Sequence, residues 1–219
     1  MENPKPKKTI QEFVPFDYPI SSKKRLKRTF DKKERDFLDV LLTRRSSAEL
    51  GSISLDTISE LLFLSNNIQQ IDIDESGYLI SKRTVPSAGG RHPVDILISL
   101  PSEDKRLLHY YNPIEHSLGE LSLSQENLKH FFEDVNMNLP IDKGCLIWFA
   151  IQTNKTKTKY TNPESLYWRD AGALLYCLQL VANYLNLKSC PLGGLAVSSF
   201  DQLFDVKNLL SGGGLLIGQ

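Results

Sequence analysis

The chain has 219 residues, of which 41% are hydrophobic and 24% charged, and its formal net charge is zero. This composition excludes a disordered, collagen-like or fibrous protein, and the length suits one domain with a substantial core. Its apolar runs are too short or too interrupted for the ~20 residues of a membrane span, so we expect no membrane contact. Three cysteines and no secretory leader predict a cytoplasmic protein without a disulfide framework.

The charges divide the sequence at about residue 35. Residues 1–35 carry eleven Lys and Arg against five Asp and Glu, and the remainder carries fifteen against twenty-one. We predict a basic N-terminal arm over residues 1–35 and one domain over residues 36–219. The run Lys23-Lys24-Arg25-Leu26-Lys27-Arg28 has the charge to meet nucleic-acid phosphates, but it lacks interleaved aromatic residues for base stacking. We therefore expect a solvated arm that does not bind nucleic acid.

Hydrophobic periodicity predicts the first helices. Residues 33–43 place Phe37, Leu38, Leu41 and Leu42 on one stripe, which indicates an amphipathic helix. A second helix is expected over residues 55–64, with Ser54 as its N-cap. Residues 81–93, with two prolines and two glycines, should form an ordered loop.

The rest of the chain mixes strands and helices. Strands are expected over residues 94–100, 107–111 and 145–151, and a helix over 123–132. The longest helix, over residues 164–187, is apolar on too much of its circumference for an outer helix, so it is central or packs on a partner chain. This order has no regular strand-helix alternation, and it favours an α+β architecture.

The first motif is Arg44-Arg45-Ser46-Ser47, directly after the first helix. Paired guanidinium groups with hydroxyls suit a phosphate monoester, because arginine offers two parallel donors and serine a third. The alternative is structural, since cations at the C-terminus of a helix complement its dipole.

Two glycine-containing segments favour a flat ligand. Residues 86–93 read Pro-Ser-Ala-Gly-Gly-Arg-His-Pro, and residues 187–194 read Leu-Lys-Ser-Cys-Pro-Leu-Gly-Gly. Small residues let the backbone approach a ring closely and present N–H groups to its polar edge. The alternatives are a tight turn before a strand and a sharp chain reversal.

Together these motifs resemble the nitroreductase superfamily. They are joined by a long helix that contains Asp170-Ala171-Gly172 and ends in Leu-x-x-Cys-Pro-x-Gly-Gly. The form Pro-Ser-Ala-Gly-x-x-x-Pro is most similar to the SagB-type dehydrogenases, the flavin subunits of azoline oxidation in peptide natural-product biosynthesis. The likeness covers about residues 37–218. Ordinary nitroreductases more often have Asn where this chain has Gly90.

The resemblance implies an FMN-binding fold. Its mixed, mainly antiparallel sheet would be flanked by helices around a long central helix, in an intertwined homodimer with two flavins at the interface. It implies that the FMN phosphate is held by Arg44, Arg45 and Ser46. The residues lining the flavin from the neighbouring subunit would be Pro86, Ser87, Ala88, Gly89 and Gly90. Those near the reactive N5 edge would be Pro191, Leu192, Gly193 and Gly194.

A fourth feature is Lys159-Tyr160, ten residues before Asp170. SagB-type enzymes have a similar pair, implicated in deprotonating the azoline while the flavin takes hydride, so the resemblance implies catalytic roles for both residues. The alternative is that residues 153–161 form a polar loop in which Lys155, Lys157 and Lys159 are solvated. The Gly-Tyr-Arg that follows the pair in those enzymes is replaced here by Leu166-Tyr167-Trp168-Arg169.

The remaining candidates carry no chemistry. The four histidines show no metal-ligand spacing, so we expect no metal site. Cys190 has no local group to lower its pKa, and we expect a packed side chain. Gly212-Gly213-Gly214 has no helix after it to bind a phosphate.

The sequence thus predicts an FMN-dependent oxidoreductase. The first hypothesis is a dehydrogenase that oxidises an azoline or similar C–N bond in a small molecule or modified peptide, together with biosynthetic partner enzymes. One alternative is an NAD(P)H-dependent nitro or quinone reductase, in which NAD(P)H would bleach the bound flavin. The other is a non-catalytic flavin-binding or partner-binding protein.

Overall fold

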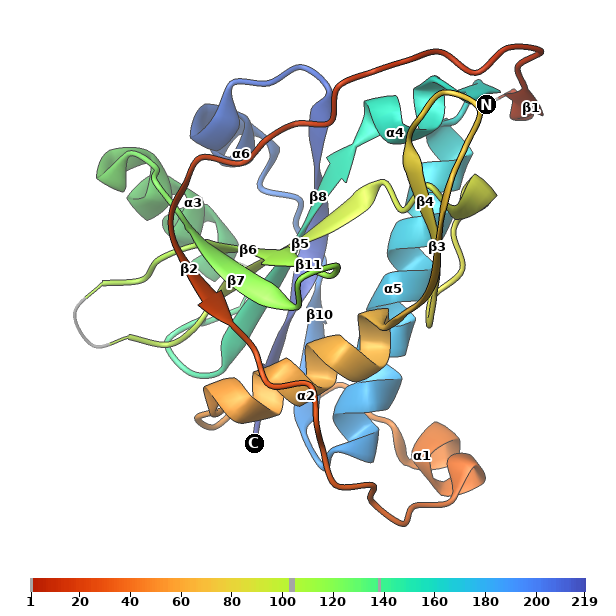
Figure 1. Ribbon diagram of the computed structural model, residues 1–219. Coiled ribbons are helices and arrows are strands. Elements are labelled where there is room, and N and C mark those ends of the chain that lie inside the picture. Colours follow the sequence, from red (N-terminus) through yellow and green to blue (C-terminus); the bar gives the residue numbers. More distant parts are fainter. Residues whose placement is uncertain (1, 103–104, 138) are drawn as a thin grey trace.

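Seven strands of the computed structural model, which describes residues 2–102, 105–137 and 139–219, form one sheet. Their order is β10-β11-β8-β5-β6-β7-β2, and every neighbouring pair is antiparallel (Figure 1). The strands are β2 Ile20–Arg25, β5 Val94–Ser99, β6 His109–Asn112, β7 Ser117–Leu121, β8 Cys145–Gln152, β10 Lys188–Leu192 and β11 Leu209–Gly218. The predicted α+β class with a mainly antiparallel sheet is confirmed.

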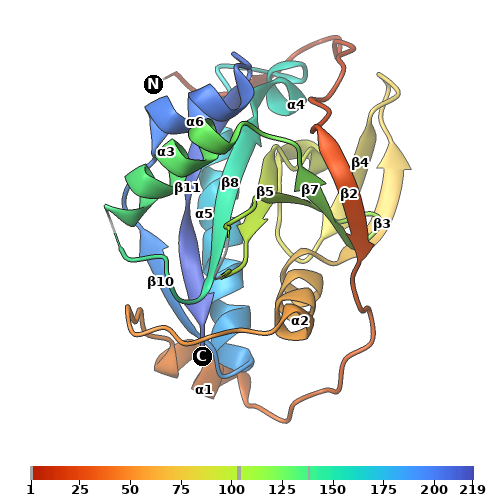
Figure 2. The same cartoon turned by 90° about the vertical axis from the view of Figure 1, so that its left-hand side faces the viewer.

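The central strand β8 is apolar on both sides, and all eight of its residues are buried. Ile147 and Phe149 enter one hydrophobic cluster, whereas Leu146 and Trp148 enter the other, as the two-residue period of a strand requires. The first cluster lies under α2 (Leu55–Asn66) and α5 (Glu164–Tyr184), and the second under α3 (Gln125–Asn136) and α6 (Val197–Phe204). Figures 1 and 2 show these helix pairs on opposite faces of the sheet.

The first helix is shorter than predicted. Helix α1 spans Phe37–Thr43, because Asp36 caps it and its carboxylate accepts a hydrogen bond of 2.8 Å from the Leu38 N–H. The expected apolar stripe is exposed on this chain, with Phe37 68% and Leu42 68% accessible, while Val40 is the buried residue of the helix. The periodicity therefore predicted the helix correctly, but the apolar face that it defines does not enter the core of this chain.

The other elements agree with the sequence in type. Ser54 caps α2 as predicted, accepting a hydrogen bond of 3.1 Å from the Thr57 N–H. Helix α5 ends at Tyr184, and its buried residues include Ala171, Leu174 and Leu178. Within the described residues, no helix combines the length and apolar character that a bilayer span requires.

The N-terminal residues do not form a free solvated arm. Strand β2 pairs with β7 at the edge of the sheet, and β1 (Lys5–Pro6) pairs with β9 (Tyr160–Thr161). The side chains of β2 are exposed, so its cations are solvated although its backbone is part of the sheet. Lysine on such an edge discourages pairing with further strands.

Several segments without a predicted element are regular. A hairpin of β3 (Ile68–Ile73) and β4 (Leu79–Arg83) precedes the short 3-10 helix η1 (Ala88–Gly90). The polar stretch after β8 contains helix α4 (Thr153–Lys157). The glycine run 212–214 lies inside β11, where a Cβ on Gly214 would clash with Trp148.

Candidate functional site

The loop of residues 86–90 is fastened to the long helix. Ser87 donates a hydrogen bond of 2.6 Å from its hydroxyl to the Asp170 carboxylate on α5, and the Ala88 N–H lies 3.4 Å from the same oxygen. The Ser87 hydroxyl also accepts a hydrogen bond of 2.8 Å from the His92 N–H. Burial raises the pKa of Asp170, and the bond from Ser87 opposes that rise. The loop therefore has a fixed position relative to α5.

Gly89 brings the loop to the predicted catalytic pair. Its φ is +65°, a backbone angle that residues with a side chain rarely adopt. A Cβ built there would lie 2.9 Å from Lys159 Nζ and 3.0 Å from the Tyr160 hydroxyl. Both polar groups thus converge on a glycine whose missing side chain makes their approach possible. The structure brings the second and fourth sequence motifs together.

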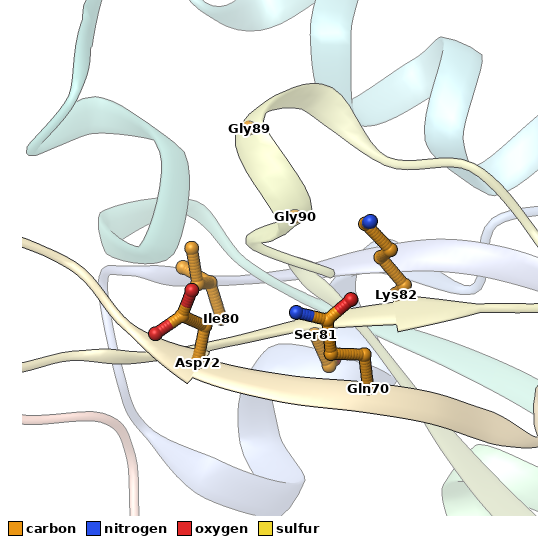
Figure 3. A pocket seen from close by; sticks show the side chains of 7 residues that line it. All are labelled: Gln70, Asp72, Ile80, Ser81, Lys82, Gly89 and Gly90. Atoms are coloured by element: carbon orange, nitrogen blue, oxygen red, sulfur yellow. The ribbon is translucent and has the colours of Figure 1, made fainter.

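The same glycines line a pocket. Its volume is about 210 Å³, and it lies between the β3–β4 hairpin and η1 (Figure 3). The lining residues are Gln70, Asp72, Ile80, Ser81, Lys82, Gly89 and Gly90. A cofactor or drug-sized ligand usually occupies ~300–1,000 Å³, so this pocket in one chain is too small for a flavin.

The first motif meets the start of β10. Ser46 forms a parallel bridge with Ser189, and the Ser47 N–H donates a hydrogen bond of 3.0 Å to the Ser189 carbonyl. Arg45 Nη1 donates to the carbonyls of Leu42 at 3.1 Å and Arg44 at 3.0 Å, so its side chain also closes the end of α1. Among the described residues neither arginine pairs with a carboxylate. This donor set fits a phosphate monoester.

The third motif extends along the edge strand. Pro191 and Leu192 pair with β11 opposite Leu215 and Gly214, and the edge position tolerates a proline. Gly193 is exposed, and a Cβ there would have no atom within 4 Å. The glycine is therefore not explained by packing inside this chain.

The first motif lies at the other end of α5 from the second and fourth motifs. Ser87 is bound to Asp170 near the start of the helix, whereas α1 is bound to its end, where Asn183 Nδ2 donates to the Val40 carbonyl at 2.6 Å. The rise from Asp170 to Asn183 is roughly 20 Å at the α-helical rise per residue. Two groups are thus separated within one chain. The phosphate-type group consists of Arg44, Arg45 and Ser46, and the Gly89 group consists of Gly89, Lys159 and Tyr160.

A buried polar cluster lies beneath the Gly89 group. Asp95 accepts hydrogen bonds from Lys155 Nζ at 2.7 Å, Gln152 Nε2 at 2.5 Å and the Tyr18 hydroxyl at 3.1 Å. Lys155 is 8% exposed, so the alternative of a loop of solvated lysines was wrong for this residue, whereas Lys157 is exposed as that alternative predicts. The sequence analysis missed this cluster, although one acid inside the apolar strand 94–100 was a usable signal.

His92 is neutral and structural. Its Nε2 lies 2.9 Å from the Ser81 carbonyl, and burial together with the nearby Arg83 cation lowers its pKa to about 3. Within the part of the chain that the structure describes, no three His, Cys, Asp or Glu side chains gather to hold a metal ion.

The sequence and the fold are both similar to those of known nitroreductases. The sequence matches the nitroreductase family over residues 49–218, and no curated protein sequence matches it. A solved protein described as a nitroreductase from Ralstonia eutropha JMP134 has a TM-score of 0.68 at 18% identity, with 100% of this chain and 98% of the other covered. These two findings confirm the predicted nitroreductase-like fold.

Two further solved structures share the fold. One, described as a nitroreductase in complex with FMN from Desulfovibrio desulfuricans, has a TM-score of 0.54 at 13% identity and covers 85% of this chain and 87% of its own. The other is a chain of the E. coli microcin synthetase McbBCD complex with truncated pro-MccB17 bound. It has a TM-score of 0.60 at 16% identity and covers 91% of this chain and 79% of its own.

Proposed function

The chain belongs to the nitroreductase family and is an FMN-dependent oxidoreductase, and we propose that it is a dehydrogenase of the SagB type that oxidises an azoline or a similar C–N bond. The observation that carries this proposal is the convergence of Lys159 Nζ and the Tyr160 hydroxyl on Gly89. Structural similarity to a synthetase that binds a peptide precursor supports a modified peptide as substrate, with biosynthetic partner enzymes.

The residues present suit FMN. Arg44, Arg45 and Ser46 would hold its phosphate, and the backbone at exposed Gly193 and half-buried Gly194 would approach the ring. Pro86, Ser87, Ala88, Gly89 and Gly90 would line the ring from the second subunit. FMN supplies the acceptor for the two electrons that leave the substrate.

The chain's own residues would handle the proton. Lys159 Nζ would accept the proton that leaves the azoline ring carbon, and the neighbouring Tyr160 hydroxyl would orient the ring or relay that proton. Gly89 leaves the space in which both groups reach the substrate. The Ser87–Asp170 hydrogen bond holds this loop in place.

We propose a homodimer because the site is divided. The first motif lies at the other end of α5 from the second and fourth, so a second copy is needed to bring one chain's phosphate-type group to the other chain's Gly89 group. The exposed stripe of α5, with Trp168 41% and Tyr176 45% accessible, supplies an apolar surface for that contact. The exposed Phe37 and Leu42 of α1 add to it.

Single-turnover reduction of the bound flavin by a synthetic thiazoline peptide tests the proposal. Lys159→Ala should slow this step by ~10²–10⁴-fold, the usual contribution of a positioned acid–base group, with flavin content unchanged. Tyr160→Phe isolates the hydroxyl, and Lys157→Ala is the matched exposed control. Equal rates in all variants contradict the proton-transfer role. Bleaching by NAD(P)H with no response to the peptide would instead establish the reductase.

A further inference from the structure

The segment that carries Lys159 and Tyr160 is paired with the N-terminus of the chain. The Lys7 N–H donates a hydrogen bond of 2.8 Å to the Lys159 carbonyl, and the Gln11 N–H donates one of 3.1 Å to the Thr158 carbonyl. In the β1–β9 ladder, Pro6 lies opposite Tyr160. Figure 1 shows the N-terminal chain crossing the molecule to reach this place beside α4.

The local bonds of this segment join Thr158 and Lys159 to the end of α4, where the Thr158 N–H and hydroxyl both donate to the Asn154 carbonyl. Among the described strands, β9 has β1 as its one partner, and it is two residues long. On the side of α4, the Lys159 N–H donates a hydrogen bond of 3.1 Å to the Thr156 carbonyl. A strand pair this short is not stable by itself. The position of β9 therefore depends on how firmly the N-terminal chain is held.

The N-terminal chain is held firmly beyond the contact. The Phe13 ring packs on Tyr78 with centroids 4.8 Å apart. The Phe16 N–H donates a hydrogen bond of 2.7 Å to Gln152 Oε1, and the Tyr18 hydroxyl reaches buried Asp95. These anchors hold the chain directly after residues 5–11, and through it the pairing with the backbone at Lys159.

We propose that residues 5–11, the N-terminal strap, position Lys159 and Tyr160 for the reaction. The strap sets the backbone from which both groups project toward Gly89, and Lys7 is a positioning residue through its N–H. The inference rests on the proposed function for its kinetic consequence. Its structural part, that the strap holds residues 158–161, stands independently of catalysis.

The test removes one N–H from the intact chain. Lys7→Pro abolishes the donor to the Lys159 carbonyl. Lys7→Ala keeps that N–H and removes the side-chain bond from Lys7 Nζ to Gln11 Oε1. Lys8→Pro places a proline one residue along, where the backbone N–H makes no hydrogen bond with any described residue. All three are compared with the wild-type holoprotein.

Two measurements follow, one without turnover. Lys7→Pro should raise amide hydrogen exchange in residues 158–162 by ~10-fold or more, because the segment opens locally. It should also lower kcat on the thiazoline peptide by ~10–100-fold with KM and FMN content unchanged, because a displaced group loses only transition-state contacts. Lys7→Ala and Lys8→Pro should match the wild type in both measurements.

The outcomes distinguish the role of the strap from the proposed role of Lys159 as the base. Unchanged exchange in Lys7→Pro, or an equal change in Lys8→Pro, overturns the strap. Raised exchange with unchanged kcat, where Lys159→Ala is slow, shows that the strap does not position the reacting group and also overturns the proposal. A wild-type rate in Lys159→Ala refutes the proposed function of Lys159, while the exchange result still decides whether the strap holds the segment.

Discussion

Gly89 lies so close to Lys159 that a Cβ on the glycine would be 2.9 Å from the lysine Nζ. The proposed base, Lys159, can therefore occupy its position only because residue 89 has no side chain. The φ of +65° at Gly89 is a second reason for glycine, because a residue with a side chain is strained in this backbone conformation.

We expect Gly89→Ala to lower turnover by ~10–100-fold, because the methyl group would displace Lys159 Nζ from its position. Gly77→Ala is the matched control, since Gly77 has a φ of +78° and no atom within 4 Å of its added Cβ. Both variants should lose about 1–2 kcal/mol of stability from the positive φ. Equal turnover in the two variants would contradict the steric role of Gly89.

Lys155→Met should be strongly destabilising. The change leaves the Asp95 carboxylate, 8% exposed, without its cation, and breaking a buried ion pair costs about 3–5 kcal/mol. Urea unfolding measures this loss. The exposed control Lys157→Met should change stability by less than about 0.5 kcal/mol. Adding Asp95→Asn to Lys155→Met should recover part of the loss; a further loss would show that the charge pair is not the cause.

His92 should make the fold sensitive to acid. Burial lowers its pKa to about 3 from the ordinary value of 6.5, so the unfolded chain binds the proton more tightly. The stability from the neutral ring is complete above pH 6.5 and is lost as the pH falls toward 3. From pH 7 to pH 5 the loss should be about 2 kcal/mol. Unfolding at both pH values should show a smaller difference in His92→Asn, and an identical difference would exclude His92 as the cause.

Arg44→Ala and Arg45→Ala should each weaken FMN binding by about 1.5–3 kcal/mol, the value of a charge-assisted hydrogen bond. Titration of the apoprotein with FMN measures the affinity. Lys207→Ala is the control, because Lys207 is exposed and lies outside the three motifs. Unchanged affinity in both arginine variants would contradict phosphate binding and leave the closing of α1 as the role of the Arg45 side chain.

Gly172→Glu should convert the proposed dimer to a monomer. Gly172 is exposed on α5 between Trp168 and Tyr176, and a Cβ there has open space, so a glutamate fits in the single chain. In the proposed dimer it would place a charge in the apolar contact. Sedimentation at micromolar concentration tests this, with the exposed Ser198→Glu as control. A Gly172→Glu variant that stays dimeric would place the interface elsewhere.

Local sequence information was enough for the elements whose pattern is local. The short, continuous apolar run over 145–151, bounded by Gly144 and polar residues, predicted β8, and Ser54 predicted the start of α2, because run length and capping are local features of the sequence. The nitroreductase family was identified from three short motifs, since cofactor-binding loops need particular small or charged residues. The site assignments that rest on those motifs stay predictions.

Long-range pairing had no comparable signal. The strand β9 exists because residues 5–6 reach it from about 155 positions away, and nothing in either segment indicates the other. Lys155 looked solvated among threonines and lysines, and only the approach of Asp95 from β5 allows its charge to be buried. The apolar stripe of α1 predicted a helix but not its partner, because periodicity defines a face and not what covers it. The sequence by itself determined the family, the cofactor chemistry and the local elements. The tertiary structure decided which charges are buried, and that the first motif lies at the other end of α5 from the second and fourth.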